Sequence, residues 1–356
     1  MKYTVGFDAK RAFHNSSGLG VYSRELISSV QRIISEKNIV LFTPQKKIWQ
    51  SSLKTYTSTL GFIWRSFLIY FDIKKSGISI YHGLAGELPF WMPSDVRKIV
   101  TIHDILFERF PNDYPWIDRI LYRFKAKHAC QHADIIIAIS HATKKELVQR
   151  YGIDGTKISV IPNGIAPIDR QLHSSDNRLI SRDYILCISS FMPRKNQELL
   201  VKAYCQIADN VSFDLIFIGT GKHLHHVQKL AKTSPFSERI IFMGQVSDEE
   251  KINLLIHAHF SVYPSKYEGF GIPIIEAFAL ECPILISDND IHREVGGDAA
   301  FYFENENVND LSAQLLRMNT LTPVERKEAQ VNGKLKLSEF DSEIIAKRLV
   351  ETIYQL

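Results

Sequence analysis

Short apolar runs recur along the whole chain, and most are followed by a stretch in which apolar residues have helical spacing. A continuous short apolar run is typical of a strand that is buried on both faces. The runs predicted to be strands are residues 3–7, 39–42, 79–81, 97–102, 134–139, 158–161, 184–188, 214–218, 239–242, 259–263 and 283–286. The pattern therefore predicts strands and helices in alternation through both halves of the chain.

Two helical stretches allow more than one interpretation. Residues 62–71 are apolar nearly all round, which favours a core helix; the alternative is a surface that meets lipid or a lipid-linked acceptor. Residues 114–132 form a long predicted helix with four basic residues, for which a solvated face is the default and membrane contact the alternative. These basic residues are Arg119, Arg123, Lys125 and Lys127.

Length and composition limit the class of protein. A chain of 356 residues with 45% hydrophobic and 23% charged residues is typical of a soluble protein with two domains. A net charge of +4 does not suggest nucleic acid, although it suits an anionic donor or membrane surface. The cysteines form no closely spaced pair, which argues against a zinc site and fits a reducing compartment. They are Cys130, Cys187, Cys205 and Cys282.

The chain also lacks the apolar segments expected of a secreted or membrane-spanning protein. No apolar run is long enough to cross a membrane, and residues 1–8 resemble a strand rather than a signal peptide. We therefore expect a cytoplasmic protein, with peripheral contact to the cytoplasmic face of the membrane as an additional expectation.

The stretch from Tyr263 to Glu276 is the strongest candidate for a binding site. A buried strand ends at Tyr263, and Gly269 and Gly271 lie in the following turn, where backbone can approach a ligand closely. The helix that follows would direct free N–H groups and its positive dipole end at a phosphate. Glu268 and Glu276 can both face one ligand, and a carboxylate suits sugar hydroxyls. The alternative is a buried turn with one capping glutamate.

Two other turns have the composition of an anion site. Gly18-Leu19-Gly20 follows the first strand and precedes a helix, although a tight turn is the more common cause of such glycines. Arg194 and Lys195 lie between a strand and a helix in the second half. Arg can grip phosphate with two parallel hydrogen bonds and Lys acts as a point charge, although adjacent charges in a loop are usually just solvated.

His103 and Asp104 directly follow the predicted strand 97–102. Polar residues at the carboxyl end of a parallel strand face the ligand site of an open α/β sheet. A neutral imidazole at this position can hydrogen-bond a sugar hydroxyl or a phosphate. We interpret Asp104 as a residue that holds the imidazole or the loop.

Several segments resemble one enzyme family. Residues 268–276, Glu-Gly-Phe-Gly-Ile-Pro-Ile-Ile-Glu, resemble the signature of the retaining glycosyltransferases of family four. Further segments that resemble this family are Ile102-His103-Asp104, Ser140 to Leu147, Pro162-Asn163-Gly164, Pro193 to Asn196, and Glu294 to Ala300. The resemblance thus extends over nearly the whole chain.

The resemblance implies a GT-B fold, an α/β architecture with two Rossmann-like, doubly wound parallel-sheet domains that face across a cleft. The first domain would span residues 1–166, followed by a linker at 167–182. The second, nucleotide-sugar-binding domain would span residues 183–341. The closing helix, residues 342–356, would cross back onto the first domain.

The resemblance also implies roles for single residues. His103 would contact the transferred sugar, while Arg194 and Lys195 would clamp the donor diphosphate. Glu268 would take the sugar hydroxyls and Glu276 the ribose hydroxyls. The implied catalytic residues are His103, Glu268, Arg194 and Lys195. The implied donor-binding residues are Gly18, Gly20, Arg194, Lys195, Val246, Glu268, Gly269, Phe270, Gly271, Ile272 and Glu276.

The implied activity is the retaining transfer of a hexose from a nucleotide-diphosphate sugar to a saccharide or lipid-linked acceptor in bacterial surface polysaccharide assembly. Residues 6–11 and 18–22 are similar to mannosyl- and rhamnosyltransferases, so GDP-mannose is the first expectation for the donor. Asp288-Asn289-Asp290 looks like the metal motif of the other glycosyltransferase fold, but it lies where this family has an ordinary turn. We therefore expect no metal and no cofactor.

Two alternatives remain open from the sequence. One is an epimerase or phosphorylase on the same fold, and the other is a sensor that binds a sugar nucleotide without turnover. Since His103, Glu268, Arg194 and Lys195 are all present, nothing in the sequence suggests an inactive site. Donor hydrolysis measured with and without acceptor sugars distinguishes these classes.

Overall fold

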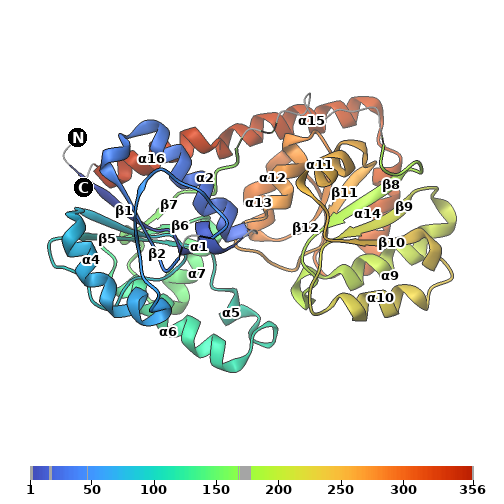
Figure 1. The fold of residues 1–356 in the computed structure, drawn as a ribbon. Coiled ribbons are helices and arrows are strands. Elements are labelled where there is room, and N and C mark those ends of the chain that lie inside the picture. Colours follow the sequence, from blue (N-terminus) through green and yellow to red (C-terminus); the bar gives the residue numbers. More distant parts are fainter. Residues whose placement is uncertain (1–2, 16–17, 46, 167, 169–177, 355–356) are drawn as a thin grey trace. The chain divides into compact units, whose positions relative to one another are not determined.

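A computed structural model of the chain describes residues 3–15, 18–45, 47–166, 168 and 178–354 (Figure 1). The chain forms two compact units, each built around one parallel sheet. Unit 1 comprises residues 1–166 and 340–356, and unit 2 comprises residues 167–339. The predicted linker at 167–182 lies largely outside the described residues.

Unit 1 contains a seven-stranded parallel sheet in the order β3-β2-β1-β4-β5-β6-β7. Its strands are β1 (Val5–Asp8), β2 (Ile39–Thr43), β3 (Lys54–Thr57), β4 (Ile80–Gly83), β5 (Arg97–Ile102), β6 (Ile135–Ala138) and β7 (Ile158–Val160). Its helices are α1 (Lys10–His14), α2 (Gly18–Ile33), α3 (Gly61–Ile63), a π-helix (Trp64–Leu68), α4 (Ile69–Ser76), α5 (Leu106–Arg109), α6 (Trp116–His132), α7 (His141–Tyr151) and α16 (Ser342–Tyr354).

Unit 2 contains a six-stranded parallel sheet in the order β10-β9-β8-β11-β12-β13. Its strands are β8 (Tyr184–Ile188), β9 (Asp214–Ile218), β10 (Ile240–Gly244), β11 (Phe260–Tyr263), β12 (Ile284–Asp288) and β13 (Phe301–Glu304). Its α-helices are α9 (Gln197–Ile207), α10 (Leu224–Lys232), α11 (Asp248–His257), α12 (Ile272–Ala279), α13 (Asp290–Gly296), α14 (Val308–Asn319) and α15 (Pro323–Leu337).

The strand order reverses once in each sheet. In unit 1 the reversal lies between β1 and β4, and in unit 2 it lies between β8 and β11. Loops that leave the carboxyl ends of the two strands at such a switch point diverge to opposite faces, and ligands of doubly wound folds bind in the crevice between them. The β8–α9 and β11–α12 loops, which carry Arg194, Lys195 and Glu268, flank this point in unit 2.

Apolar side chains cover both faces of the sheet in unit 1. On one face Phe7 packs in a cluster with Ile27 of α2 and Leu349 of α16. On the other face Ile73 of α4 and Ala129 of α6 belong to a second cluster. The parallel strands are therefore buried on both sides, which explains their continuous apolar runs. The prediction of two Rossmann-like parallel-sheet domains is confirmed.

Every strand predicted from the apolar runs is present, with its ends within two residues of the prediction. The pattern missed β3 (Lys54–Thr57), an edge strand with a half-exposed polar sequence, and β13 (Phe301–Glu304) at the edge of the second sheet. The helix expected at 114–132 begins at Trp116.

Two local predictions are wrong. Gly18 and Gly20 were expected in a loop, but both lie in the first turn of α2. Gly20 is needed there because a Cβ would lie 1.9 Å from the carbonyl oxygen of Asn15. Residues 62–71 are not a core helix throughout, since Phe62 and Phe71 are more than half exposed and the segment is divided by a π-helix.

Candidate active site

Two loops at the switch point of unit 2 are joined by a backbone hydrogen bond. The β8–α9 loop carries Arg194, and the β11–α12 loop begins after Tyr263. The Lys266 N–H donates to the carbonyl oxygen of Arg194 at 2.8 Å, which fixes one loop against the other. Residues far apart in the sequence are thereby held beside one another.

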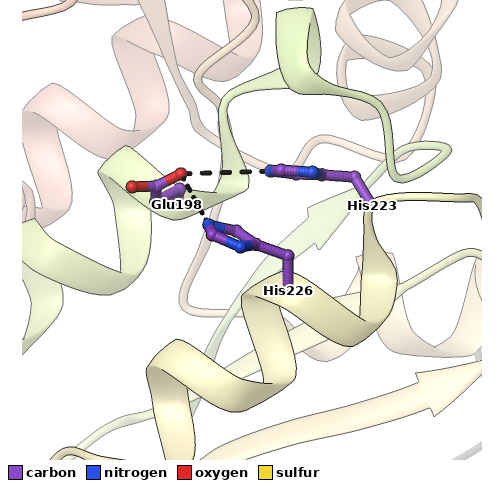
Figure 2. Close-up of side chains that lie close together, drawn as sticks. All are labelled: Glu198, His223 and His226. Atoms are coloured by element: carbon purple, nitrogen blue, oxygen red, sulfur yellow. Dashed lines mark hydrogen bonds and ion pairs between the residues drawn. The ribbon is translucent and has the colours of Figure 1, made fainter.

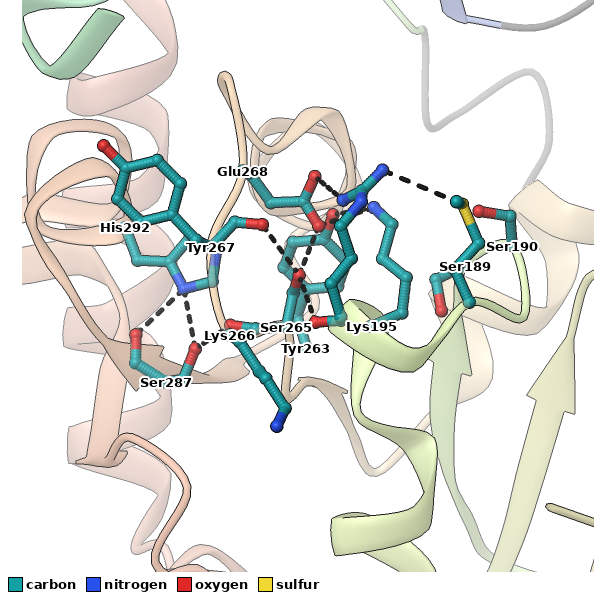
Figure 3. Close-up of polar contacts among 12 residues, drawn as sticks. Ser189, Ser190, Lys195, Tyr263, Ser265, Lys266, Tyr267, Glu268, Ser287 and His292 are labelled. Atoms are coloured by element: carbon teal, nitrogen blue, oxygen red, sulfur yellow. Dashed lines mark hydrogen bonds and ion pairs between the residues drawn. The ribbon is translucent and has the colours of Figure 1, made fainter. Parts of the chain in front are cut away.

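A buried charge cluster fills this junction. Arg194 Nη1 lies 2.8 Å from Glu268 Oε2, and Lys195 Nζ lies 2.6 Å from Glu268 Oε1. Lys195 Nζ also donates to the Tyr263 hydroxyl at 2.8 Å, and the Ser265 hydroxyl donates to Glu268. Figure 3 shows Lys195, Tyr263 and Ser265 grouped around the carboxylate of Glu268. The structure thus brings three of the four predicted catalytic residues together.

Burial and charge act in opposite directions on Glu268. Burial raises the pKa of this carboxyl, but the cations of Lys195 and Arg194 outweigh that effect and lower the pKa to about 2. For Lys195, burial and then repulsion from Arg194 lower the pKa, while Glu268 raises it. Glu268 is therefore ionised at neutral pH, and one carboxylate faces two basic side chains.

The cluster is supported by buried polar residues that the sequence did not single out. Gln197, the first residue of α9, donates from Nε2 to the Ser189 hydroxyl at 2.7 Å and to the Ser190 carbonyl at 3.0 Å. On the other side, the Ser287 hydroxyl donates to the carbonyl oxygen of Ser265 and lies 3.0 Å from His292 Nδ1. Burial lowers the pKa of His292 to about 4, so this ring is neutral. These contacts hold both loops in place.

The predicted phosphate-binding turn leads into α12, which begins at Ile272. Gly271 precedes the helix with a φ of 113°, a conformation that favours glycine. Gly269 and Phe270 are buried, and Ile272 is half-buried.

Glu276 has a different partner from Glu268. Its carboxylate accepts from Lys251 Nζ of α11 at 2.9 Å, so the two glutamates of the motif are engaged by different cations.

Val246 is half-buried in the loop between β10 and α11, where Ser247 caps α11 and Glu250 completes the capping box. The Asp288 carboxylate binds Arg293 at 2.6 Å, and the Asn289 side chain caps α13. These two residues therefore have local structural partners.

His103 and the two glycines Gly18 and Gly20 lie in unit 1. His103 Nε2 lies 2.9 Å from the carbonyl oxygen of Leu84, so this nitrogen carries the proton. Burial lowers the pKa of His103 to about 4, against the opposing effect of that hydrogen bond. At neutral pH the ring is uncharged, and Nδ1 is left as a hydrogen-bond acceptor. Asp104 accepts from the Leu106 N–H at 3.1 Å and so holds the loop.

A cavity of about 170 Å³ opens beside His103 within unit 1. Its lining includes Arg11, Glu87, Asp104 and Lys125 as well as the histidine. This volume and its mixture of charged groups suit a polar ligand of the size of a monosaccharide.

A second charged network shares Glu87 and Lys125 with the lining of this cavity and was not predicted from the sequence. Arg65 is 7% exposed and binds Asp8 of β1, with Nε 2.9 Å from Oδ2, and it also pairs with Glu87. Lys125 lies 3.2 Å from Glu87, which lines the cavity. A charged residue inside the apolar run 62–71 was the available signal, because a buried arginine needs a carboxylate partner.

Comparisons with known proteins identify the family. Residues 170–334 match the family model of the Glycosyl transferases group 1, and residues 46–167 match that of Glycosyltransferase Family 4. The two matches lie one after the other and together cover most of the chain. The chain belongs to this family of GT-B glycosyltransferases, as the resemblance of its motifs implied.

Two curated relatives are similar over about two thirds of this chain. The O-antigen chain mannosyltransferase RfbU of Salmonella typhimurium is 29% identical over 237 residues, which are 66% of this chain and 62% of the relative. The O-antigen chain mannosyltransferase B of Escherichia coli is 30% identical over 249 residues, which are 67% of this chain and 64% of the relative. The alignments thus span less than two thirds of the length of both relatives.

A solved structure confirms the fold. Anabaena Alr3699/HepE, crystallised in complex with UDP and glucose, has a TM-score of 0.75 and 16% sequence identity, and the match covers 99% of this chain and all of that one.

Proposed function

We propose that the chain transfers a hexose, with mannose as first choice, from a nucleotide-diphosphate sugar to a saccharide or lipid-linked saccharide in bacterial surface polysaccharide assembly. The observation that carries the proposal is the buried cluster of Arg194, Lys195 and Glu268 at the switch point of unit 2. The two O-antigen mannosyltransferase relatives support the choice of mannose. The HepE neighbour, which has the same fold, holds UDP and supports a nucleotide-diphosphate donor.

The charges of the cluster favour an anionic ligand. Two basic side chains face one carboxylate, and each of the three is about nine-tenths buried. A buried excess of positive charge is costly in free energy unless an anion compensates it. A donor diphosphate would supply that anion, with Arg194 gripping phosphate oxygens and Lys195 acting as a point charge.

The same groups would assist bond cleavage without a metal. As the glycosidic bond breaks, negative charge grows on the leaving diphosphate, and cations already in position stabilise it. The N–H groups at the start of α12 add to this stabilisation. We therefore propose that transfer needs no metal ion, and a chelator that abolished activity would contradict this.

The geometry of Glu268 argues against a covalent intermediate on this residue. A nucleophilic carboxylate must offer its lone pair to the sugar, as in the retaining hydrolases. Glu268 instead has its oxygens engaged by Arg194, Lys195 and Ser265, and a pKa of about 2 makes it a weak nucleophile. We propose retention by front-face attack of the acceptor, shielded by the donor's own diphosphate. An inverted product would contradict it.

In unit 1 we propose that the cavity beside His103 binds a saccharide. With its proton on Nε2, neutral His103 presents Nδ1 as an acceptor, which suits a sugar hydroxyl as donor. Glu87 and Lys125 on the cavity wall can bind further hydroxyls.

Unit 1 also carries an exposed apolar surface, which we propose binds an anionic membrane. Trp116, Ile117, Ile120 and Phe124 of α6 are between 55% and 66% exposed. Their positions fall on one side of the first half of the helix, while Ala126, Ala129 and Cys130 in its second half face the core.

Aromatic contacts extend this surface beyond α6. The ring centroids of Phe124 and Phe90 lie 5.7 Å apart, and the ring of Phe90 stacks on that of Phe67. The ring of Phe67 in turn contacts the exposed Trp91, with ring centroids 5.2 Å apart. Lys125 lies 4.8 Å from the ring centre of the exposed Phe62. Unit 1 also has exposed basic residues on two of its helices, Arg123 and Lys127 on α6 and Lys74 and Lys75 on α4. A mixture of aromatic and basic side chains is typical of membrane-surface contacts.

Such a surface contact does not require a spanning segment. None of the helices in the described residues has the length and apolarity needed to cross a bilayer. We therefore propose peripheral attachment to the cytoplasmic face of the membrane, where a lipid-linked acceptor would be available.

A panel of nucleotide diphosphates tests the proposed function. Thermal unfolding measured with GDP, UDP, ADP and TDP should show a raised midpoint with the nucleotide of the donor, because a ligand that binds only the folded state stabilises it. We expect GDP to give the largest shift. No shift with any of the four would contradict a nucleotide-sugar donor.

A turnover assay then distinguishes a transferase from a phosphorylase and from a sensor. With the matching sugar donor, nucleotide release should depend on an added saccharide acceptor. Phosphate-dependent turnover without an acceptor would favour a phosphorylase, and binding without turnover would favour a sensor.

A further inference from the structure

We propose that unit 2 carries a surface site for a divalent transition-metal ion such as Zn²⁺, held by Glu198, His223 and His226. Among the described residues, these three side chains place one ligand atom each within 4.8 Å of the others. Figure 2 shows both imidazoles directed at the carboxylate of Glu198. This site is separate from the proposed reaction and does not depend on it.

The distances between the ligand atoms suit a small metal ion. Glu198 Oε2 lies 3.2 Å from His226 Nε2 and 3.9 Å from His223 Nε2. Tetrahedral zinc with bonds of about 2.0–2.1 Å to nitrogen and oxygen requires ligand atoms roughly 3.3 Å apart. Small side-chain rotations would therefore bring all three atoms onto one ion, with water completing its coordination. Two histidines and a carboxylate are a ligand set that zinc commonly takes.

The carboxylate is held in a suitable orientation. Lys202, one turn further along α9, binds Glu198 Oε1 at 2.6 Å. That contact leaves Oε2 as the oxygen that faces the two imidazoles. A metal-binding carboxylate is commonly oriented by such an outer partner.

The two histidines are likewise positioned by a firm scaffold. His223 precedes α10 and His226 lies in its first turn, so their rings stack with centroids 4.6 Å apart. The His223 N–H donates to the carbonyl oxygen of Phe191 at 3.2 Å, and the Phe191 N–H donates to Thr220 at 2.9 Å. Gly221 permits this approach, because a Cβ there would lie 2.3 Å from the Phe191 carbonyl oxygen.

The site would join two segments of unit 2. Glu198 is the second residue of α9, directly after the loop with Arg194 and Lys195, while the histidines belong to the start of α10. A bound ion would therefore cross-link the starts of α9 and α10 and stabilise the folded unit.

The experiment uses the full chain, stripped of metal and freed of any polyhistidine tag. Titration with Co²⁺ should give visible d–d absorption bands that saturate at one equivalent, and Zn²⁺ should abolish them by displacement. His226→Gln and His223→Gln should each weaken Zn²⁺ binding by about tenfold or more in competition with a chromophoric chelator. His225→Gln is the matched control, because this exposed neighbour lies outside the cluster.

Thermal unfolding gives a second measurement. Zn²⁺ should raise the unfolding midpoint of the wild-type chain and of H225Q, but not that of the double variant H223Q/H226Q. The proposal is overturned if the stripped wild-type chain shows no saturable binding, if the double variant binds as well as wild type, or if H225Q loses as much affinity as H226Q. Because neither measurement uses a sugar nucleotide, failure of the proposed transfer reaction would leave these results unaffected.

Discussion

At the scale of single residues, Glu268 determines how the two cations of unit 2 are presented. Its carboxylate lies between Arg194 and Lys195, and the residue as a whole is only 6% exposed. Without Glu268, two adjacent cations would be buried together and would repel each other. We therefore interpret Glu268 as the residue that makes a buried, net positive site possible, in addition to its proposed contact with the sugar.

Replacement of Arg194 should weaken donor binding. Arg194→Ala would remove the proposed charged hydrogen bonds to the diphosphate, each worth about 1.5–3 kcal/mol, so the Kd for the nucleotide should rise roughly tenfold to a hundredfold. Isothermal titration calorimetry with the best nucleotide of the panel measures this change. Arg293→Ala is the control, because that arginine pairs with Asp288 at the surface. Equal affinities for R194A and wild type would show that Arg194 does not bind the donor.

The pKa of Glu268 predicts a specific loss of stability in acid. Its folded pKa of about 2 lies below the ordinary value of 4.5, so the stabilisation is complete above pH 4.5 and is lost as the pH falls toward 2. The shift corresponds to a contribution on the order of 3 kcal/mol. Urea unfolding at a series of pH values should show this decline in the wild type.

Glu268→Gln is the comparison for that measurement. This variant should be less stable at pH 7, because an amide cannot balance the two cations, and its stability should depend less on pH between 4.5 and 2. If the free energies of unfolding of the wild type and of E268Q changed in parallel with pH, the assigned ion pairs would be contradicted.

His103 should stay uncharged over the working pH range. Because burial lowers its pKa to about 4, the transfer rate should show no ionisation of this residue near pH 6.5. His103→Ala should lower kcat/KM by about tenfold through loss of one hydrogen bond, with an unchanged pH profile above pH 5. An acidic limb near pH 6.5 that is present in wild type and absent from H103A would contradict the neutral tautomer.

At the scale of elements, the strands were predictable and the polar contacts of the loops were not. A buried parallel strand is a local pattern, and β5, β8 and β9 have the predicted bounds. The partners of a loop residue depend on which strands the sheet places side by side. Nothing near Glu276 in the sequence indicates Lys251, and nothing near Glu268 indicates Ser287 behind Ser265.

The candidate site was likewise predictable from the sequence only in part. The sequence motifs identified Arg194, Lys195 and Glu268, and the structure places them in contact. Gln197 and His292 were missed because a single polar residue on an apolar helix face has no distinctive pattern. Arg65 was missed because the surrounding apolar run dominated the interpretation of residues 62–71, although its charge required a partner such as Asp8.

The last helix, α16, provides a test at the level of one element. Ile345, Ala346 and Leu349 are buried in the core of unit 1, against α2. Leu349→Ala should lower the free energy of unfolding by about 2–5 kcal/mol through lost burial and the cavity left behind. Ile344→Ala is the control, because Ile344 is 57% exposed on the same helix. Chemical denaturation measures both, and equal effects would mean that α16 does not pack as described.

At the scale of the whole molecule, the candidate catalytic residues of each unit lie in loops at or next to the reversal of strand order in its own sheet. Such a reversal creates a place for a ligand through the topology of the sheet and not through a particular sequence. Both units therefore share this architecture, although the side chains at the reversal differ. Unit 2 carries the excess of basic groups that suits a diphosphate. Unit 1 carries the cavity beside His103 and the exposed apolar surface on α6.

The apolar surface of unit 1 predicts binding to anionic lipid. The wild-type chain should sediment with vesicles that contain phosphatidylglycerol, and less with phosphatidylcholine alone. Trp116→Ser combined with Ile120→Ser should weaken this binding by at least about tenfold, because each side chain loses roughly 1.5–3 kcal/mol of burial in the bilayer surface. The control replaces Val324 and Leu335 of α15 by Ser, since these residues are similarly exposed in unit 2. An equal loss of vesicle binding in both double variants would contradict a specific membrane-binding surface on unit 1.

The discontinuity of unit 1 has a consequence for how the protein is made. When the ribosome has translated residue 166, all seven strands of the first sheet have been synthesised, but α16 is translated only after the whole of unit 2. Until then, the stripe of α2 that packs against α16 stays uncovered on the nascent chain. Unit 2 is fully synthesised at residue 339, before α16, so it can complete its fold before unit 1 although its synthesis begins later. We therefore expect chaperones that bind nascent chains to stay on the first unit until the closing helix has emerged.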